Sequence, residues 1–488
     1  MVEVEVARLA GAIGGSVVGP DGSGSIHVTH ITHDSRSVVA GSLFCCVVGE
    51  RSDGHDFATD AVAAGATALL VERRLDLDVA QIVVADSRGA MGPAAALLFG
   101  DPTRHGLEVI GVTGTNGKTT VSRLIAELST DLGVPCGVVG TLTGPRTTPE
   151  APELWAALRG FLDAGSRRAA IEVSSHALDR HRVEGIRFAV AVFTNLGVDH
   201  LDYHGTREQY FAAKARLFHP SFTDLVVLNR DDVHGRLLLD VSHRAGLSVV
   251  PYGLDDAEDL VMDMSGSRFR WRGRRVAVPL VGRFNVSNAL AAAETLVALG
   301  HGVDDVAAAM EGLTPPPGRF ERIDVGGGVS AIVDYAHTPE ALENVLATVR
   351  EVNEGGRVIT VFGCGGDRDH GKRPLMGRAA ADASDVVIVT TDNARGEDPS
   401  SIAAQVLAGT RIAGRESDAR VQVVLDRRDA IAAALATAAP GDVVVVAGKG
   451  HETTQIIGDA AVHFDDREVV RSLAVDAPVR QSLGEVPS

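Results

Sequence analysis

The sequence predicts an α/β protein with three domains, and three observations lead to this fold class. The chain has 488 residues, and a typical domain of about 150 residues gives a prior of three domains. Short apolar runs alternate with helix-like segments, which is the rhythm of buried parallel sheets. A glycine-rich turn at 111–117 joins one such run to a helical segment, as in a phosphate-binding P-loop domain.

Two breaks divide this pattern. Asp101-Pro102 is typical of a loop, and Pro315-Pro-Pro-Gly318 interrupts the alternation of strands and helices. We therefore predict domains at residues 1–105, 106–318 and 319–488. The expected strands are 25–32, 42–48, 67–71 and 81–84, then 107–113, 169–173, 188–194 and 225–229, then 330–334, 357–362, 386–391 and 442–447; the expected helices include 56–64, 91–99, 118–128 and 339–349.

Composition excludes several classes of protein. The net charge is −18, which argues against a sequence-independent nucleic-acid binder or a binder of anionic membranes. No apolar run approaches the ~20 residues that span a bilayer, and the acidic start is unlike a signal peptide. The four cysteines form no CxxC pair, so neither a zinc ribbon nor a disulfide framework is indicated. We expect a cytoplasmic protein with no membrane span and no nucleic-acid partner.

Lysine usage points to chemistry. The 46 basic residues include only four lysines, namely Lys118, Lys214, Lys372 and Lys449. An amine can lose its proton and react, whereas a guanidinium cannot. Positions that keep lysine in an arginine-rich chain are therefore candidates for chemistry that arginine cannot perform.

The first of these lysines lies in Gly111-Val-Thr-Gly-Thr-Asn-Gly-Lys-Thr-Thr120. Successive N–H groups of such a loop cradle phosphate oxygens, and the following helix adds its partial positive charge. The strict pattern has Gly where Val112 stands, so this is a variant with Gly111 and Gly114. The candidate ATP-binding residues here are Gly114, Thr115, Asn116, Gly117, Lys118, Thr119 and Thr120.

Polar side chains follow two of the predicted strands. Glu172 ends an apolar run and is suited to hold Mg²⁺ at the sheet edge that carries the phosphate loop. His200 and His204 are four residues apart, which would put them on one face of a helix, with Asp199 and Asp202 beside them. A second reading of this region is a nucleotide switch or regulatory ATPase, since 229–232 (Asn-Arg-Asp-Asp) faintly matches a guanine-reading Asn-Lys-x-Asp, with Arg in place of Lys.

At this point the chain resembles a known family, the Mur ligases, which are the ATP-dependent amide-bond ligases of peptidoglycan synthesis. The resemblance runs from Asp34-Ser-Arg36 to Ala447-Gly-Lys-Gly-His-Glu452. It rests on five further motifs, Thr113-Gly-Thr-Asn-Gly-Lys-Thr119, Glu172-Val-Ser-Ser-His176, Thr194-Asn-Leu with Asp199-His-Leu-Asp-Tyr-His-Gly205, Asp334-Tyr-Ala-His-Thr-Pro339 and Phe362-Gly-Cys-Gly-Gly-Asp-Arg368.

The resemblance implies an N-terminal α/β UDP-substrate domain, a central P-loop ATPase domain and a C-terminal Rossmann-like domain. It implies addition of the third residue to UDP-N-acetylmuramoyl-L-alanyl-D-glutamate through an acyl phosphate, with ATP and Mg²⁺, by a protein we expect to be a monomer. Lys118, Glu172, His200 and Lys214 would be catalytic. Thr119, Glu172, His200 and Lys214 would hold metal, with Lys214 carbamylated to N6-carboxylysine, because a lowered-pKa amine can capture CO₂.

The resemblance also assigns substrate contacts. For ATP these are Asn285, Asn288, Arg319 and Asp334, and for the UDP substrate they are Ser35, Thr147, Thr148, Ser174, Arg180 and Arg182. Arg146 and Arg180 depart from the usual Asn and Gln of the family. Both changes add positive charge near an anionic substrate.

The amino-acid site is assigned to Arg368, Asp392, Asn393, Ala394, Arg395, Gly448 and Glu452. Members that add diaminopimelate carry Asp-Asn-Pro-Arg, and here Ala394 replaces the proline, which loosens the turn without removing a charge. Arg368 and Arg395 suit a distal carboxylate, which diaminopimelate has and lysine lacks. We therefore expect meso-diaminopimelate as the amine, with L-lysine or another diamino acid as the alternative.

Two other readings remain open at this level. Folylpolyglutamate synthetases share the phosphate chemistry and the carbamylated lysine but lack an N-terminal uridine domain, so residues 1–105 argue against them. A non-catalytic nucleotide-binding homologue would be expected to have lost Lys118, Glu172, His200 or Lys214, and all four are present.

Overall fold

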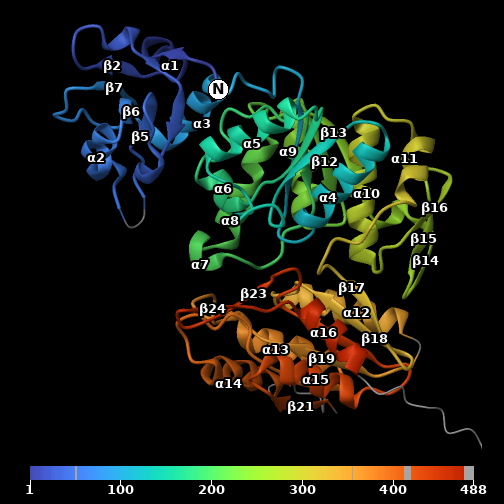
Figure 1. The fold of residues 1–488 in the computed structure, drawn as a ribbon. Helices are drawn as coiled ribbons and strands as arrows, with labels where there is room; N and C mark the ends of the chain where they lie inside the picture. The colour runs from blue at the N-terminus through green and yellow to red at the C-terminus, as the bar shows by residue number, and fades with distance from the viewer. Residues whose placement is uncertain (50–51, 354, 412–418, 477–488) are drawn as a thin grey trace, which may run out of the picture.

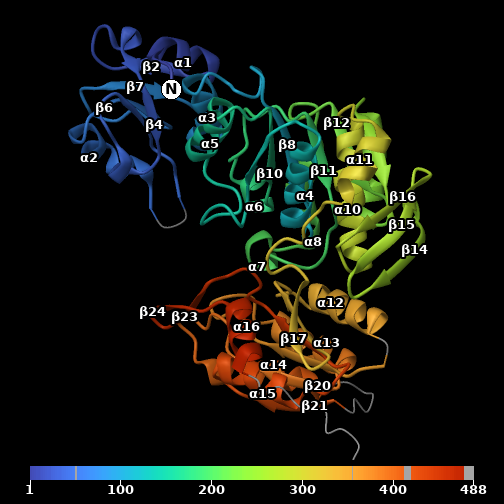
Figure 2. The same ribbon diagram turned by 45° about the vertical axis from the view of Figure 1, so that its right-hand side comes forward.

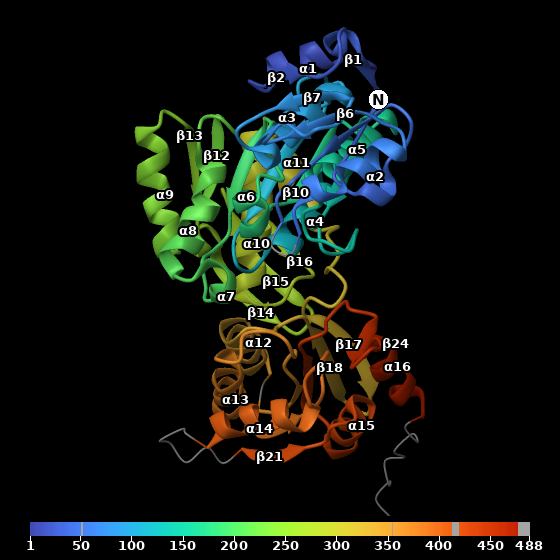
Figure 3. The ribbon, with the colours of Figure 1, turned by 90° about the vertical axis from the view of Figure 1, so that its left-hand side faces the viewer.

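The computed structural model describes residues 1–49, 52–353, 355–411 and 419–476 (Figure 1). Three α/β units follow one another along the chain, each built on its own mainly parallel sheet. The N-terminal and C-terminal units contact different sides of the central unit (Figures 2 and 3). None of the helices in the described ranges is both long and apolar enough to cross a membrane. The mixed α/β fold class is confirmed, while the proposed boundaries at residues 105 and 318 stay predictions.

The N-terminal unit has a five-stranded sheet of order β2-β7-β6-β5-β4, parallel except for β2. The run expected at 25–32 is two short strands that belong to different sheets. The helix expected at 91–99 begins at Ser87, because Asp86 accepts hydrogen bonds from two N–H groups of its first turn. The elements are β1 Val4–Glu5, α1 Val6–Ala12, β2 Ser16–Val18, β3 His27–Val28, β4 His30–Thr32, β5 Ser42–Cys45, α2 Ala58–Ala63, β6 Ala66–Val71, β7 Ala80–Val83 and α3 Ser87–Leu98.

The central unit contains six parallel strands in the order β13-β12-β11-β8-β10-β9. Its four expected strands all exist, within two residues at each end. A three-stranded antiparallel sheet, β14-β15-β16, was not expected from the pattern. The elements are β8 Glu108–Thr113, α4 Lys118–Asp131, β9 Cys136–Val139, α5 Ala151–Asp163, β10 Arg168–Glu172, α6 Ser175–Asp179, β11 Val190–Phe193, α7 Leu201–His204, α8 Arg207–Ala215, β12 Leu225–Asn229, α9 Val233–Arg244, β13 Ser248–Tyr252, β14 Glu258–Asp263, β15 Gly266–Trp271, β16 Arg274–Val278, α10 Arg283–Ala298 and α11 Val303–Met310.

The C-terminal unit has a six-stranded sheet of order β17-β18-β22-β19-β20-β21, with only β17 antiparallel. The apolar strand β22 is buried at the centre, as its unbroken run of valines predicts. The elements are β17 Glu321–Gly326, β18 Val329–Asp334, α12 Pro339–Val352, β19 Val358–Phe362, α13 Lys372–Ala383, β20 Val386–Val389, α14 Pro399–Thr410, β21 Arg420–Val423, α15 Arg427–Thr437, β22 Val443–Ala447, β23 Thr454–Ile457, β24 Ala460–His463 and α16 Asp466–Asp476.

The apolar cores connect the units unequally. One cluster is continuous from the N-terminal unit to one face of the central sheet, through the packing of α3 against α5. The C-terminal unit has two clusters of its own, to which the central unit contributes mainly the segment around Val281 and Phe284 and two methionines of β14 and the turn after it. The C-terminal unit is therefore packed less tightly onto the central unit than the N-terminal unit is.

Candidate active site

The phosphate loop joins β8 to α4, as the sequence predicts. Gly114 and Gly117 have φ values of 153° and 86°. A Cβ on Gly114 would lie 1.8 Å from Thr194 Oγ1, and one on Gly117 would lie 2.5 Å from Asn288 Oδ1. Glycine is required at both positions, because neighbouring segments approach the loop backbone directly.

Two of the four lysines meet at this loop. Lys118 Nζ donates to Gly114 O at 2.9 Å and to Thr115 O at 2.8 Å. Lys214 Nζ, from α8, donates to the same Gly114 O at 2.8 Å. Two ammonium groups thus share one carbonyl oxygen, an arrangement that is unfavourable while both carry a proton.

The surroundings of Lys214 favour the neutral amine. Its side chain is 1% exposed and packs over the Tyr210 ring, 4.5 Å from the centroid. Burial, and then the nearby Lys118 charge, hold the pKa of the Lys214 amine well below its ordinary value, against a smaller opposing effect of Asp199. Burial also lowers the pKa of Lys118.

Glu172 ends β10 beside the first turn of α4. Its Oε2 accepts from Thr119 Oγ1 at 2.8 Å and from Thr141 Oγ1 at 3.1 Å, and its Oε1 accepts from Thr141 N at 2.8 Å. The residue is 1% exposed. A carboxylate and a threonine hydroxyl beside a phosphate loop match the oxygen donors that Mg²⁺ prefers, so the two side chains fit that ion. No group of three His, Cys, Asp or Glu side chains in the described ranges is placed to hold a metal.

The histidines do not lie along one helix, as their spacing suggested. His200 has a left-handed backbone (φ 55°) and precedes α7, while His204 ends that short helix and bonds Ser175 Oγ at 2.9 Å. Both rings nevertheless contact His176, with centroids 4.8 and 5.4 Å away. Burial lowers the pKa of His200 to about 4, so its imidazole is neutral and able to act as a ligand.

Four residues assigned to the UDP substrate gather next to Glu172. Thr148 Oγ1 donates to Glu172 O at 2.7 Å and lies 3.3 Å from Ser174 Oγ. Thr147 Oγ1 bonds Thr141 Oγ1 at 3.0 Å, and Arg182 Nη1 donates to Thr148 O at 3.0 Å. Their shared position is the carboxyl edge of the central sheet.

The other two UDP-substrate residues lie apart from this group. Arg180 Nε donates to the Tyr203 hydroxyl at 3.0 Å. Ser35 begins a short 3₁₀ turn in the N-terminal unit, with Asp34 as its cap. An ion pair between Arg88 and Glu150, 3.5 Å long, links this unit to the central one, and Arg182 binds the same Glu150 at 2.7 Å.

A cavity of about 400 Å³ lies beside the phosphate loop, between α10 of the central unit and the C-terminal unit. Asn285, Asn288, Arg319 and Asp334 all line it, together with Asn116, Gly117 and Thr120. Arg319 Nη2 reaches Thr119 Oγ1 at 3.4 Å, and its guanidinium stacks 4.4 Å from the Tyr335 ring. Asp334 accepts from two backbone N–H groups, and burial raises its pKa. Seven of the eleven residues expected to bind ATP therefore line one cavity, whereas Gly114, Thr115, Lys118 and Thr119 of the phosphate loop are not among its lining residues.

The residues assigned to the amino acid follow three adjacent parallel strands. Arg368 comes after β19, Asp392–Arg395 after β20, and Gly448 and Glu452 after β22. Asn393 connects two of these segments, since its Nδ2 donates to Glu452 Oε2 at 2.8 Å. Strand β23 braces the loop, with Arg395 N donating to Ile456 O at 3.0 Å.

Arg395 and Arg368 flank Gly365. A Cβ on Gly365 would lie 3.0 Å from Arg395 Nη1 and 3.7 Å from Arg368 Cγ. Arg395 has φ 50° and donates to Gly366 O at 2.8 Å. Ala394, at the position of the family's proline, is 0% exposed, so it packs inside the loop and offers no side chain to a ligand.

The nucleotide cavity and the amino-acid loops are in direct contact. A Cβ on Gly318 would lie 2.2 Å from the Gly450 carbonyl carbon, and Gly448 N donates to Asp334 O at 3.1 Å. The rings of Tyr335 and His451 lie 5.0 Å apart. The backbones of the two sets of residues therefore touch.

Comparison with known proteins matches this architecture to one family. Three family models cover the chain: "Mur ligase family, catalytic domain" over residues 27–105, "Mur ligase middle domain" over 112–296 and "Mur ligase, glutamate ligase domain" over 318–450. The UDP-N-acetylmuramoyl-L-alanyl-D-glutamate–2,6-diaminopimelate ligase of Geobacillus kaustophilus (strain HTA426) is 44% identical over 477 residues, covering 92% of this chain and 95% of that protein. The chain belongs to the Mur ligase family.

Other proteins and solved structures similar to this Mur ligase support the same family. The 2,6-diaminopimelate ligase of Streptomyces coelicolor is 42% identical, covering 96% of this chain and 95% of its own. A solved structure of a UDP-N-acetylmuramoyl-L-alanyl-D-glutamate–2,6-diaminopimelate ligase has a TM-score of 0.69 and 35% identity, covering 97% and 99% of the two chains. The Mycobacterium tuberculosis folylpolyglutamate synthase complexed with ADP, with a TM-score of 0.59, 22% identity, and 72% and 90% of the two chains covered, shares the fold alone.

Some residues of this Mur ligase's site were missed by sequence reasoning. Thr141 binds both oxygens of Glu172, yet nothing in its neighbourhood marks it as special. Tyr210 packs on Lys214 and bonds Thr115 Oγ1 at 3.0 Å. Lys449 was noted for its rarity but received no role. The lysine count gave a signal for Lys449 alone, and no sequence signal marked Thr141 or Tyr210.

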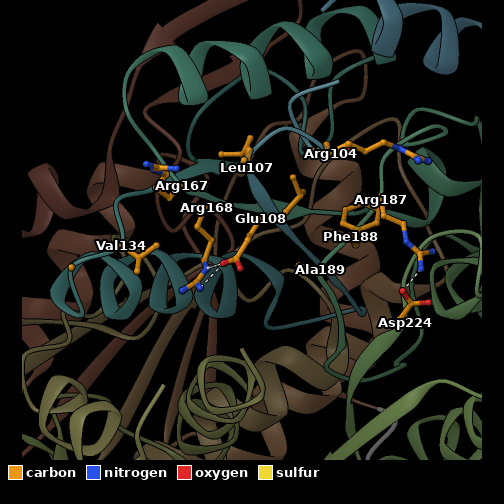
Figure 4. Close-up of a pocket in the computed structure, with 14 residues that line it drawn as sticks. Arg104, Leu107, Glu108, Val134, Arg167, Arg168, Arg187, Phe188, Ala189 and Asp224 are labelled. Carbon is orange, nitrogen blue, oxygen red and sulfur yellow. Dashed lines mark hydrogen bonds and ion pairs between the residues drawn. The ribbon is translucent and has the colours of Figure 1, made fainter. Parts of the chain in front are cut away.

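A hollow of about 690 Å³ lies away from this site, at the amino ends of β8, β10 and β11 (Figure 4). Two ion pairs lie in its lining: Arg168 binds Glu108 at 2.6 Å, and Arg187 pairs with Asp224. None of the expected site residues lines it. The hollow therefore offers no chemistry for this family's reaction.

Proposed function

We propose that this Mur ligase joins 2,6-diaminopimelate to UDP-N-acetylmuramoyl-L-alanyl-D-glutamate in peptidoglycan precursor synthesis, with conversion of ATP to ADP and phosphate. The observation that carries the reaction class is the meeting of Lys118, Lys214 and Glu172 at the phosphate loop. Relatives at 42–44% identity over more than nine-tenths of the chain carry this activity in their names. The proposal extends to a monomer in the cytoplasm.

The site residues have separable roles in this proposal. The loop N–H groups and Lys118 hold the ATP phosphates, while Asn285, Asn288, Arg319 and Asp334 surround the rest of the nucleotide. Glu172 and Thr119 would hold one Mg²⁺, and His200 with carbamylated Lys214 a second. The metal would supply positive charge that offsets the repulsion between phosphate and carboxylate.

The reaction has two steps. The glutamate side-chain carboxylate of the UDP substrate attacks the γ-phosphorus of ATP, ADP leaves, and an acyl phosphate forms. The amine of the incoming amino acid then attacks the acyl carbon, loses a proton and expels phosphate. Lys118 stabilises the developing charge in the first step, because a buried cation acts strongly in a site that excludes water. Thr147, Thr148, Ser174 and Arg182 are proposed to hold the dipeptide beside Glu172, with Arg180 and Ser35 reached by its more distant parts.

Carbamylation of Lys214 explains its unfavourable surroundings. A buried amine of depressed pKa that shares a carbonyl with a second ammonium is poorly matched as a cation. The neutral amine attacks CO₂, a C–N bond forms, a proton is released, and the resulting carbamate is an anion that Lys118 and a metal would favour. Arginine has no such option.

The choice of amine rests on charge. Arg395 and Arg368 would bind the distal carboxylate of meso-diaminopimelate, and Glu452 the adjacent ammonium. L-lysine, the alternative, offers no carboxylate there, and its ammonium would be repelled by the arginines.

The test is a reconstituted reaction. Purified protein is incubated with ATP, Mg²⁺ and the UDP-dipeptide, together with meso-diaminopimelate, L-lysine or no amine. We expect ADP and an amide product, identified by mass, with diaminopimelate. ATP consumption that ignores the UDP-dipeptide, or no amide with any amine, would refute the proposal; amide formation with lysine alone would overturn the choice of amine.

A further inference from the structure

Lys449 is the one retained lysine whose surroundings are fully formed but which the proposed reaction does not use. It lies in the turn after β22 and is 0% exposed. Its Nζ donates to Thr454 O at 2.6 Å and lies 3.3 Å from Glu452 Oε2 and 3.4 Å from Asn393 Oδ1. A buried ammonium is costly unless it is paired, and Glu452 is its carboxylate partner.

The protein binds one of the two carboxylate oxygens of Glu452. Its Oε2 accepts from both Asn393 Nδ2 and Lys449 Nζ, and the side chain is 32% exposed. In the described ranges, no hydrogen bond is recorded for its Oε1. One carboxylate oxygen is therefore fixed by the protein, while the other can accept a donor from a ligand.

Asn393 connects this pair to the arginines. Its amide bonds Glu452, and its backbone carbonyl lies 3.4 Å from Arg395 Nη1. Among the charged side chains assigned to this site, Glu452 is paired with Lys449, and the two guanidinium groups of Arg395 and the exposed Arg368 outnumber the one remaining carboxylate, that of Asp392, so the site keeps a positive charge. A distal end that carries both an ammonium and a carboxylate fits this balance, whereas an ammonium alone does not.

We propose that Lys449 is a specificity-determining counter-ion. By neutralising Glu452 from beneath, it prevents that carboxylate from attracting amines that end in an ammonium alone, and so favours an amine with a zwitterionic distal end. This inference rests on the proposed function and deepens it. Lys449 acts through Glu452 and is a positioning residue rather than a catalytic one.

The test compares kcat/KM for meso-diaminopimelate with kcat/KM for L-lysine in wild type and variants. Lys449→Met keeps the length of the side chain and removes its charge, which leaves Glu452 uncompensated. We expect the diaminopimelate-to-lysine ratio to fall at least about tenfold, since an unscreened charge in a partly buried site acts with this strength. The KM for ATP should stay unchanged.

Gln455→Met is the matched control. Gln455 Nε2 donates to the backbone carbonyls of Thr391 and Asp392, so it braces the same loop without carrying a charge. Its replacement should raise the KM of both amines together and leave their ratio unchanged. A loss of loop order alone is thereby separated from a loss of charge.

Glu452→Gln gives a result of opposite sign and does not depend on burying a new apolar group. It leaves the Lys449 charge uncompensated, so the ratio should rise above that of wild type. The double variant Lys449→Met/Glu452→Gln restores a neutral pair, and its ratio should return toward wild type. A purely structural lysine predicts instead that the double variant is no better than Lys449→Met.

The outcomes distinguish a failure of the proposed ligase activity from a failure of the proposed role of Lys449. Wild-type protein that forms no amide with either amine would refute the proposed function, and this inference with it. An active wild type with an unchanged ratio in Lys449→Met overturns the inference alone. If Lys449→Met does not fold, as judged by circular dichroism, Glu452→Gln decides, and an unchanged or lowered ratio overturns the proposal.

Discussion

The amino edge of the central sheet and the phosphate loop at its carboxyl edge treat basic side chains in opposite ways. At the amino edge, Arg168 is bound by Glu108, and Arg187 by Asp224 (Figure 4). At the carboxyl edge, Lys118 and Lys214 share Gly114 O, and among the described residues neither ammonium lies within 4.0 Å of a carboxylate. A paired charge belongs to a finished structure, whereas a buried unpaired charge indicates a place where a ligand completes the pairing.

The largest expected effect is at the carboxyl edge. Lys214→Arg keeps a positive charge but cannot be carbamylated, so amide formation should fall by at least about a hundredfold, the usual cost of losing one transition-state group. Turnover of the UDP-dipeptide and diaminopimelate measures it, with circular dichroism to check the fold. Near-normal turnover would contradict the role of this amine.

Arg187→Gln is the matched variant at the amino edge. It removes a surface pair with Asp224, and pairs of this kind contribute at most about 1 kcal/mol. Turnover should therefore equal that of wild type. An effect comparable to that of Lys214→Arg would remove the distinction between the two edges.

The second effect is on stability rather than activity. Arg168→Met keeps the aliphatic stem of a side chain that is 3% exposed and loses the bonds to Glu108, Ser129 and His301. The free energy of unfolding should fall by about 1.5–3 kcal/mol, as for hydrogen bonds of charged groups. Urea unfolding measures this, and KM values at 25 °C should not change. A changed KM for ATP would show that this edge also serves the reaction.

Arg395 lies at the carboxyl edge of the C-terminal sheet, where a ligand is again expected. Arg395→Ala should raise the KM for diaminopimelate at least about tenfold, because a charge-assisted bond to the distal carboxylate is lost. The KM for ATP, measured in the same assay, should be unaffected. An unchanged KM for the amine rejects the assignment, and Arg368→Ala should have a smaller effect because Arg368 is exposed.

The smallest effect concerns the residue that departs from the family pattern. In the described part of the chain, no hydrogen bond is recorded for the Ala394 N–H, so a proline there would remove no hydrogen bond. Ala394→Pro should leave kcat/KM for diaminopimelate within about twofold and raise stability by about 0.4–1 kcal/mol through the unfolded chain. A large drop in kcat/KM would mean that the looser turn matters for amine choice.

The sequence predicted features formed by residues that are close together along the chain, and it missed contacts between residues that are far apart in it. The phosphate loop and Glu172 were predictable, because a strand, a glycine turn and a helix occur within a short stretch of chain. The partners Thr141 and Tyr210 were not, because they reach Glu172 and Lys214 only through the order of the strands. The start of α3 was missed because one side chain, Asp86, sets it.

The surroundings of the predicted residues also depend on contacts between distant positions of the chain. Lys214 could be suspected from lysine scarcity, yet its sharing of Gly114 O with Lys118 is a contact between positions 100 residues apart. The spacing of His200 and His204 suggested a helix face, and a left-handed residue at His200 broke that helix. The metal and substrate roles of these residues stay predictions.

The backbone contact between Gly318 and Gly450 has a practical consequence for protein engineering. The proline run just before Gly318 is an obvious crossover point for chimeras that exchange the amino-acid-binding half between ligases. Any side chain at Gly318 would strike the Gly450 carbonyl carbon, 2.2 Å from its Cβ. A crossover before Gly318 takes both glycines from the same parent, whereas a crossover placed after Gly318 takes them from different parents and must keep glycine at both positions.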